Sequence, residues 1–525
     1  MAKFNKRKTR TAVGRGPIVA EATPSTLTHE GAPGYRRDAR SELFLLAVAN
    51  FVSEDTFYES ARTRDTRFAR LVEQVAVEDI AWFAPFVRWL RAEANMRSAS
   101  LVAAAEGVHA RLAAGVHGGN RQLVDTALLR ADEPGEFIAY WRSRHGRALP
   151  QPVKNGLGDA VRRLYTERSL AKYDTSGQGY RFADVIDTVR PNPVSEDQSA
   201  LFEHALARRH GRDEMFRLGR LPLLSRRAEL FAVPAAKRRA VLGDPARLRA
   251  AGMTWEALSA WLEGPMDRQA WEAVIPSMGI MALARNLRNF DEAGVSDKVA
   301  KRVAATFTNR DEVARSRMFP FRWLAAYQQA PSLRWGQALD AALQASLANL
   351  PALRGRTLLL VDTSASMSSG GFSKHSTMSP VKAAAVFGVA LAAKGERVDL
   401  HGFADGVFRH QVRAGASVIR EVDAFCHRVG EVGHGTNIAQ SIRATYRDHD
   451  RVVVVSDMQT MDSGTSRAVP ADVPLYGFNL GGYRAAAFDA GSPNRIEFGG
   501  LTDATFRMLP LIEAGQRAAW PWEEA

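Results

Sequence analysis

The stretch R-T-L-L-L-V-D-T-S-A-S-M-S-S, residues 356–369, decides the fold of the C-terminal part of the chain. Residues 357–361 form a short, continuous apolar run, and polar, loop-forming residues follow it. Such a run predicts a buried strand of a parallel sheet that opens into a loop at its carboxyl end. Open α/β sheets bind their ligands at that end of the strands. We therefore expect a ligand site in the loop that follows this strand.

The loop carries Asp362, Ser364 and Ser366 in a D-x-S-x-S spacing. One carboxylate and two hydroxyl groups are hard oxygen donors, which suit Mg²⁺ better than a softer metal ion. The spacing alone is a weak signal, because Asp and Ser are ordinary loop residues. The alternative is a doubly wound domain whose loops are merely polar.

This pattern resembles the metal-ion-dependent adhesion site of von Willebrand factor A domains. The resemblance implies a Thr from a second loop and an Asp from a third. The segment G-H-G-T-N at 433–437 offers Thr436, and the apolar run at 451–456 is followed by Asp457. In A domains the open coordination position takes a carboxylate from a partner protein. The predicted ligands of a divalent cation, Mg²⁺, are Asp362, Ser364, Ser366, Thr436 and Asp457.

Apolar runs and helical patterns alternate through residues 352–525, which predicts a doubly wound α/β domain with helices on both faces of a parallel sheet. We expect strands at 357–361, 397–403, 452–456 and 474–479. We expect helices at 380–394, 418–429, 437–446 and 502–511.

Composition limits the class of protein. A chain of 525 residues with 46% hydrophobic residues is long enough for two or more folded domains. The formal net charge of +13 favours a polyanionic partner, usually nucleic acid or an anionic membrane, although basic proteins without such a partner are common. The single cysteine, Cys426, excludes an internal disulfide and a Cys-based zinc site. Without an apolar run of membrane-spanning length or a signal-peptide core, we expect a cytoplasmic protein.

Residues 31–351 show a helical pattern throughout, with no convincing strand. Successive helices joined by short turns predict an α-solenoid, and the lack of a fixed period indicates degenerate, HEAT-like repeats. The alternative is an irregular helical domain. Residues 1–30 are basic and rich in Gly, Pro and Thr, which predicts a disordered arm. The predicted domains are therefore 1–30, 31–351 and 352–525.

Basic side chains are dense on the predicted helices, and Tyr165 and Tyr173 lie among them. Tyrosine rings stack on bases in single-stranded RNA, whereas a buried tyrosine is the commoner case for either residue alone. Part of this charge must be solvated surface, because its spacing does not fit one helical face. The predicted RNA-binding residues are Arg97, Arg130, Lys154, Arg162, Arg168, Lys172 and Tyr173.

Four segments of the helical half resemble the TROVE domain of the Ro ribonucleoprotein autoantigen family. They are G-A-P-G-Y-R-R-D-A-R-S-E-L-F-L-L at 31–46, D-T-F-Y-E at 55–59, A-L-A-R-N-L-R-N-F at 282–290 and S-R-M-F-P-F-R-W-L-A-A-Y at 316–327. A TROVE region followed by an A domain is also the domain order of that family. The resemblance covers nearly the whole chain after residue 30.

The resemblance implies a ring of HEAT-like repeats that the A domain helps to close within one chain, so we expect a monomer. It implies that small non-coding RNA such as Y RNA binds the basic outer surface, and that 3′ ends of misfolded RNA enter the central hole. It also implies an exoribonuclease as a partner and no enzymatic activity of the chain itself. Lys172 and Tyr173 match a family Lys-Tyr segment, whereas Phe182 stands where the family has a His. That departure affects the detailed contact with Y RNA.

Two other functions fit parts of the sequence. The first is a protein–protein adaptor, because A domains also serve AAA+ ATPases in metal insertion or assembly. An adaptor needs no continuous basic groove. The second is a nuclease, which predicts Mg²⁺-dependent RNA cleavage that Asp362→Ala abolishes.

Overall fold

The computed structural model describes residues 14–49, 53–212, 218–330, 332–348, 350–370, 378–413, 416–500, 508–510, 512–513 and 519–523. The chain divides into two compact units. The first unit comprises the described residues within 1–75, 319–325 and 343–525, and the second comprises those within 76–318 and 326–342. These units differ from the predicted ranges, because the N-terminal residues pack on the C-terminal α/β domain.

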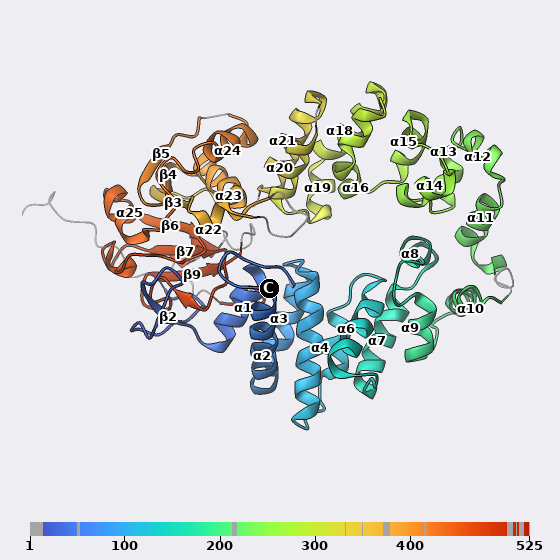
Figure 1. Cartoon of the computed structure of the whole chain (residues 1–525), viewed down its shortest axis with the longest axis horizontal. Coiled ribbons are helices and arrows are strands. Elements are labelled where there is room, and N and C mark those ends of the chain that lie inside the picture. Colours follow the sequence, from blue (N-terminus) through green and yellow to red (C-terminus); the bar gives the residue numbers. More distant parts are fainter. Residues whose placement is uncertain are drawn as a thin grey trace, which may run out of the picture. The chain divides into compact units, whose positions relative to one another are not determined.

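A mixed sheet forms the core of the first unit, with the strand order β5-β4-β3-β6-β7-β9 (Figure 1). All neighbouring strands are parallel except the antiparallel pair β4 and β5. The four predicted strands are confirmed, whereas β5 and β9 were not predicted. The strands are β3 (Arg356–Asp362), β4 (Arg397–Phe403), β5 (Val407–His410), β6 (Arg451–Ser456), β7 (Leu475–Asn479) and β9 (Arg495–Gly499).

The central strand β3 lies between β4 and β6, so its residues after Arg356 are buried. Helix α23 (Pro380–Lys394) packs against β3 and β4. Gly388 permits this approach, because a Cβ atom there would lie 2.8 Å from Cγ2 of Val361. Helices α22 (Ala365–Ser368), α24 (Val418–Cys426) and α25 (Ile438–Thr445) complete the domain with the 3₁₀ turn η4 (Thr465–Arg467). The predicted helix at 502–511 lies mostly outside the described residues.

The N-terminal segment packs on this α/β domain. Strands β1 (Thr26–Leu27) and β2 (Pro33–Arg36) form a small antiparallel sheet with β8 (Ala485–Ala486). Ile18 and Thr28 are buried, so the prediction of a disordered arm is wrong for residues 14–30, and residues 1–13 lie outside the described residues. Strand β2 likewise contradicts a wholly helical 31–351. Both errors have one cause: the strand partner, β8, is distant in the sequence.

Helix α1 (Ala39–Ala49) contacts β9 in the first unit, and α2 (Ala61–Glu78) leads into the second. The connection back to the α/β domain contains α20 (Pro320–Gln329), the 3₁₀ turn η3 (Leu333–Trp335) and α21 (Gly336–Ser346). No helix in the described ranges is long and apolar enough to cross a membrane.

The second unit is built from helices, and its described residues contain no strand. The extensive helix contacts, such as α3 with α4 and α5 with α7, join helices that are near each other along the chain. That pattern confirms the predicted α-solenoid architecture. The helices are α3 (Ile80–Ala92), α4 (Arg97–Ala113), α5 (Asn120–Thr126), α6 (Glu133–His145), α7 (Gln151–Leu164), α8 (Glu167–Tyr173), α9 (Phe182–Val189), α10 (Glu196–His210), α11 (Pro222–Phe231), α12 (Ala235–Val241), α13 (Pro245–Ala250), α14 (Trp255–Leu262), α15 (Arg268–Val274), α16 (Ile280–Arg285), α17 (Leu287–Glu292), α18 (Asp297–Thr308) and α19 (Arg310–Ser316), with 3₁₀ turns η1 (Leu218–Arg220) and η2 (Ile275–Ser277).

Local capping explains where several of these helices begin. The side chain of Ser195 accepts a hydrogen bond from the Gln198 amide at the start of α10, and Thr254 does the same for α14. These side chains satisfy backbone N–H groups that have no partner within the helix. Gly211 ends α10 in the left-handed conformation, which glycine adopts without a steric penalty.

Candidate metal centre and basic surface

The first and third loops of the predicted metal site meet because they follow β3 and β6, which are neighbouring parallel strands. The Ser456 hydroxyl donates a hydrogen bond to Oδ2 of Asp362 over 2.5 Å, and the Ser364 amide donates to Oδ1 over 2.9 Å. The hydroxyls of Ser364 and Ser366 lie 3.2 Å apart. Asp457 follows directly after β6 and accepts from the Gln459 amide over 3.1 Å.

The loop that carries Thr436 lies against both of the others. The Ala365 amide donates to the His434 carbonyl over 2.9 Å, and the Met461 amide donates to the Thr436 carbonyl over 2.8 Å. All five predicted ligands are buried, and these backbone contacts bring their three loops together. The three loops therefore lie together, and the metal site itself stays a prediction.

Asp405 holds the Thr436 loop in place, and the sequence analysis did not identify it. One of its carboxylate oxygens accepts hydrogen bonds from the amides of His434 over 2.9 Å and Gly435 over 3.1 Å. These amides lower the pKa of the carboxyl group. A signal was present in the sequence, because Asp405 follows the predicted strand at 397–403 and therefore lies at the ligand-binding edge of the sheet.

The charge in this site favours a cation. Burial raises the pKa of both Asp362 and Asp457, and the negative charge of Asp362 raises that of Asp457 further. Among the described residues, neither carboxylate forms an ion pair with Lys, Arg or His. Two buried carboxylates without a basic partner are costly, and a bound dication offsets that cost.

The kinds of donor also fit Mg²⁺, since carboxylate and hydroxyl oxygens are hard ligands. In the part of the chain that the structure describes, no three His, Cys, Asp or Glu side chains are grouped to hold a metal ion. A metal ion here would therefore depend on the hydroxyls of Ser364, Ser366 and Thr436 in addition to the two carboxylates.

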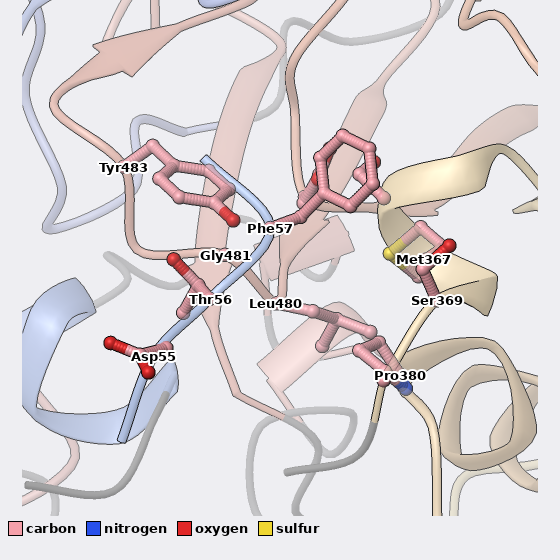
Figure 2. Close-up of a pocket in the computed structure, with 12 residues that line it drawn as sticks. Asp55, Thr56, Phe57, Met367, Ser369, Pro380, Leu480, Gly481 and Tyr483 are labelled. Atoms are coloured by element: carbon pink, nitrogen blue, oxygen red, sulfur yellow. The ribbon is translucent and has the colours of Figure 1, made fainter. Parts of the chain in front are cut away.

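A pocket of about 300 Å³ gives access to the site, and Ser366 and Asp457 line it. Figure 2 shows the segment with Asp55, Thr56 and Phe57 crossing the pocket between Tyr483 and the helix that carries Met367. One wall of the pocket thus comes from the N-terminal segment rather than from the α/β domain.

The second unit brings together four of the predicted RNA-binding residues. The Lys172 ammonium lies 4.9 Å and the Arg130 guanidinium 5.5 Å from the centre of the Tyr173 ring. Arg130 Nε donates to Oδ1 of Asp132 over 2.6 Å, and Arg97 lies 3.5 Å from Oδ2 of the same carboxylate. Tyr173 is half-buried and Lys172 is exposed. We call Arg97, Arg130, Lys172 and Tyr173 the Tyr173 cluster.

Among the described residues, no hydrogen bond, ion pair or ring contact joins the other three predicted residues to the Tyr173 cluster. Arg162 pairs with Asp159, which also pairs with Arg121. Arg168 is exposed on α8, and Lys154 is half-buried on α7.

Tyr165 is buried, so its ring is not accessible to a base. It stacks on Phe182 with ring centres 3.8 Å apart, at the position where the family resemblance predicted a His. Phe182 is therefore part of the hydrophobic core of this unit.

The sequence analysis did not identify a second contact between a cation and a tyrosine ring. The Arg142 guanidinium lies 5.3 Å from the centre of the Tyr180 ring and donates to its hydroxyl over 3.1 Å. Gly135 lies beside this pair, since a Cβ atom there would lie 2.8 Å from the Tyr180 carbonyl oxygen. No spacing in the sequence links Arg142 to Tyr180, because they lie on different segments of the unit.

Comparison with known proteins identifies a domain and a fold. The family model of the TROVE domain matches residues 250–333. The crystal structure of the Ro (RSR) protein of Deinococcus radiodurans matches with a TM-score of 0.62 and 16% sequence identity, over 91% of this chain and 100% of that chain. None of the curated proteins searched matches the sequence. The matched TROVE segment includes A-L-A-R-N-L-R-N-F at 282–290. The chain therefore contains a segment that matches the TROVE domain, and it shares the fold of the Ro (RSR) protein.

Proposed function

We propose that this chain is an RNA-binding scaffold without enzymatic activity of its own. It binds small structured non-coding RNA, of the Y RNA kind, through the Tyr173 cluster and takes part in RNA quality control. The observation that carries the proposal is the half-exposed Tyr173 ring beside the cations of Lys172 and Arg130. The TROVE match and the Ro fold support it.

The chemistry of the Tyr173 cluster suits a looped-out or single-stranded base. An aromatic ring provides a stacking surface for a base, and nearby cations attract the adjoining phosphates. Asp132 holds the Arg130 guanidinium near the ring, which reduces the conformational entropy lost on binding. The net charge of +13 adds long-range attraction for a polyanion.

The α/β domain adds a binding site for a protein ligand in this proposal. Asp362, Ser364, Ser366, Thr436 and Asp457 would hold Mg²⁺, which attracts a carboxylate group of an acidic partner. An exoribonuclease that acts on the bound RNA is the kind of partner that the scaffold would recruit. The scaffold itself supplies the binding surfaces.

The test compares the affinity of the full chain for a small stem-loop RNA between 50 and 200 mM salt, concentrations over which electrostatic binding changes strongly. We expect Tyr173→Ala to weaken binding about tenfold, since one stacked base contributes about 1–3 kcal/mol. We expect Lys172→Ala to reduce the slope of log affinity against log salt by about 0.7–0.9, the effect of one phosphate contact. Lys298→Ala is the control, because Lys298 is an exposed lysine on α18 of the same unit.

Three outcomes contradict the proposal. Equal effects of Tyr173→Ala and Lys298→Ala would remove the Tyr173 cluster from the binding surface. Mg²⁺-dependent RNA cleavage that is lost in Asp362→Ala would favour the nuclease. Absence of RNA binding together with Mg²⁺-dependent capture of a purified AAA+ ATPase would favour the adaptor.

A further inference from the structure

Phe231 places an aromatic ring at the surface of the helical unit. It is the last residue of α11, and it is 44% exposed. The Arg227 guanidinium, one helical turn earlier, lies 4.7 Å from the centre of the ring. The Phe231 ring also lies 6.3 Å from that of Trp261, which is buried. Phe231 therefore contacts the core through Trp261 while nearly half of its surface stays accessible to a ligand.

Arg227 carries a positive charge that no acidic side chain neutralises. Its guanidinium donates to the carbonyl groups of Ala251 over 3.3 Å and Gly252 over 3.4 Å. Among the described residues, no Asp or Glu forms an ion pair with it. Burial and the positive charge of Arg208 lower the pKa of Arg227 to about 10. The two carbonyl groups hold the guanidinium beside the Phe231 ring and leave its charge available to an anion.

A second cation contacts the same pair of aromatic rings. The Arg238 guanidinium lies 5.5 Å from the centre of the Trp261 ring and donates to the Trp261 carbonyl over 2.6 Å. Its acidic partner, Glu263, is exposed. Residues 222–251 carry seven Arg or Lys and two acidic side chains, so the surroundings of the ring are basic. We call Arg227, Phe231, Arg238 and Trp261 the Phe231 cluster.

The helix that carries Phe231 packs against α8, the helix that ends with Tyr173. Glu167 of α8 accepts a hydrogen bond from the Leu223 amide over 2.8 Å, at the start of α11. Gly252, which accepts from the guanidinium of the Phe231 cluster, also lies close to α8. A Cβ atom at Gly252 would lie 3.6 Å from the Cβ atom of Ala171. The two clusters therefore belong to neighbouring helices of one unit.

Arg208 on α10 adds a cation between the two clusters. Its guanidinium lies 3.7 Å from Oδ2 of Asp174, the residue after Tyr173. Its positive charge also acts on Arg227. An RNA strand that reaches from one aromatic ring to the other therefore meets a further cation along its path.

We propose that the Phe231 cluster is a second RNA-binding site, at which an unpaired base stacks on the exposed part of the Phe231 ring and Arg227 binds an adjoining phosphate. The inference rests on the proposed function, since it takes RNA as the ligand, and it adds a site for a single-stranded segment. Every base has a face that stacks on an aromatic ring, so the site tolerates any sequence. An acidic peptide would use the cations but not the ring. Because α8 and α11 are in contact, one RNA molecule can occupy both clusters, which raises its affinity above that of either site.

The first test measures binding of dodecauridylate, a single strand without secondary structure, to the full chain by fluorescence anisotropy. We expect Phe231→Ala to weaken binding about tenfold, because it removes the stacking surface for one base. Phe231→Tyr should bind as the wild type does, because it keeps the ring. Met281→Ala is the matched control, since Met281 is an apolar residue of the same unit that is 47% exposed. Equal thermal unfolding of Phe231→Ala and Met281→Ala by circular dichroism would show that the fold is intact.

The second test locates the contact in the unaltered chain. Dodecauridylate that contains 4-thiouridine is crosslinked to the wild type with near-ultraviolet light, and mass spectrometry identifies the tryptic peptides that carry RNA. Phe231 is the single aromatic residue of the tryptic peptide 228–237, and Tyr173 lies in the separate peptide 173–181. We expect adducts on peptide 228–237 both in the wild type and in Tyr173→Ala.

The outcomes separate this inference from the proposed function. If Tyr173→Ala weakens binding of the stem-loop RNA, Phe231→Ala behaves as Met281→Ala and peptide 228–237 carries no adduct, the proposed function stands and the second site is overturned. If the wild type binds neither RNA, both fall. If Phe231→Ala weakens binding of dodecauridylate while Tyr173→Ala leaves stem-loop binding unchanged, the second site stands without the Tyr173 cluster. Binding of labelled hexaglutamate that depends on Phe231, without binding of dodecauridylate, would make this a peptide site and overturn the inference.

Discussion

At the scale of single residues, Arg37 makes the most buried ion pair between the N-terminal segment and the α/β domain. Its guanidinium donates to the two carboxylate oxygens of Glu497 over 2.7 and 2.6 Å, and both side chains are fully buried. It also donates to the Tyr483 carbonyl over 2.8 Å, and Asn479 donates to Glu497 over 2.9 Å. The charged groups of Arg37 and Glu497 are buried and hydrogen-bonded. Removing either side chain would therefore leave the charge of the other buried without its partner, which lowers the stability of the fold.

We expect Arg37→Ala to lower the free energy of unfolding of the first unit by about 3–5 kcal/mol, because it leaves the Glu497 carboxylate buried without its cation. Urea denaturation of the full chain measures this change. Arg36→Ala is the control, since Arg36 is the exposed neighbouring residue at the end of β2. The double change Arg37→Met with Glu497→Met should recover most of the loss. A cost below about 1 kcal/mol for Arg37→Ala, the value typical of surface ion pairs, would contradict the role assigned to the pair.

At the scale of elements, the metal site depends on a loop with little regular structure of its own. The segment 433–437 contains two glycines, and Gly433 adopts a φ of +94°, which disfavours other residues. Asp405 fixes this loop by accepting from two successive amides. Hydrogen bonds to a carboxylate are stronger than those between neutral groups, so Asp405 adds to the contacts that the Ala365 and Met461 amides make with this loop.

Binding of Mn²⁺, a paramagnetic substitute for Mg²⁺, is measured by electron paramagnetic resonance. We expect Asp405→Ala to weaken Mn²⁺ binding about tenfold, the lower end of the range for residues that orient metal ligands. Asp405→Asn should retain most of the affinity, because the amide oxygen still accepts hydrogen bonds from the backbone. Thermal unfolding should change little, since Asp405 is exposed. If Asp405→Ala binds Mn²⁺ as tightly as the wild type, the Thr436 loop does not depend on this contact.

At the scale of the whole molecule, the two ends of the sequence fold together. Residues 14–38 contribute strands β1 and β2, the buried side chain of Ile18 and the Arg37–Glu497 pair to the unit that contains the C-terminal domain. The α/β domain therefore does not bury its own surface completely. Residues more than 400 positions away complete its burial, as the bond from Thr28 to Thr460 illustrates with a separation of 432 residues.

We expect a chain that begins at residue 39 to unfold at a temperature about 10 °C lower than one that begins at residue 14. The shorter chain leaves Glu497 buried without Arg37, which lowers the free energy of unfolding by about 3–5 kcal/mol. Each kcal/mol lowers the midpoint temperature of unfolding by about 2–4 °C in a domain of this size. Differential scanning calorimetry checks it, with the transition of the first unit assigned in the longer chain by its sensitivity to Arg37→Ala. Identical midpoints for the two chains would mean that the segment contributes nothing to the stability of the domain.

The sequence by itself determined the features that local patterns encode. The apolar run at 357–361 predicted β3, and the alternation after it predicted β4, β6, β7 and α23, because burial on both faces of a sheet requires continuous apolar residues. The D-x-S-x-S spacing placed Asp362, Ser364 and Ser366 in one loop. The helical pattern before residue 351 predicted the α-solenoid, since each helix needs only its neighbours along the chain to bury its apolar face.

The tertiary structure alone decided the features that depend on distant partners. The sequence of 26–36 is too polar to indicate strands, and they form because β8 provides their edge. Tyr165 and Tyr173 look alike in the sequence, but only Tyr173 keeps an exposed face, because Tyr165 stacks on Phe182. No spacing connects Asp405 to Thr436. Hydrogen bonds and buried charges between segments far apart in the chain place these residues together, and no local pattern records such contacts.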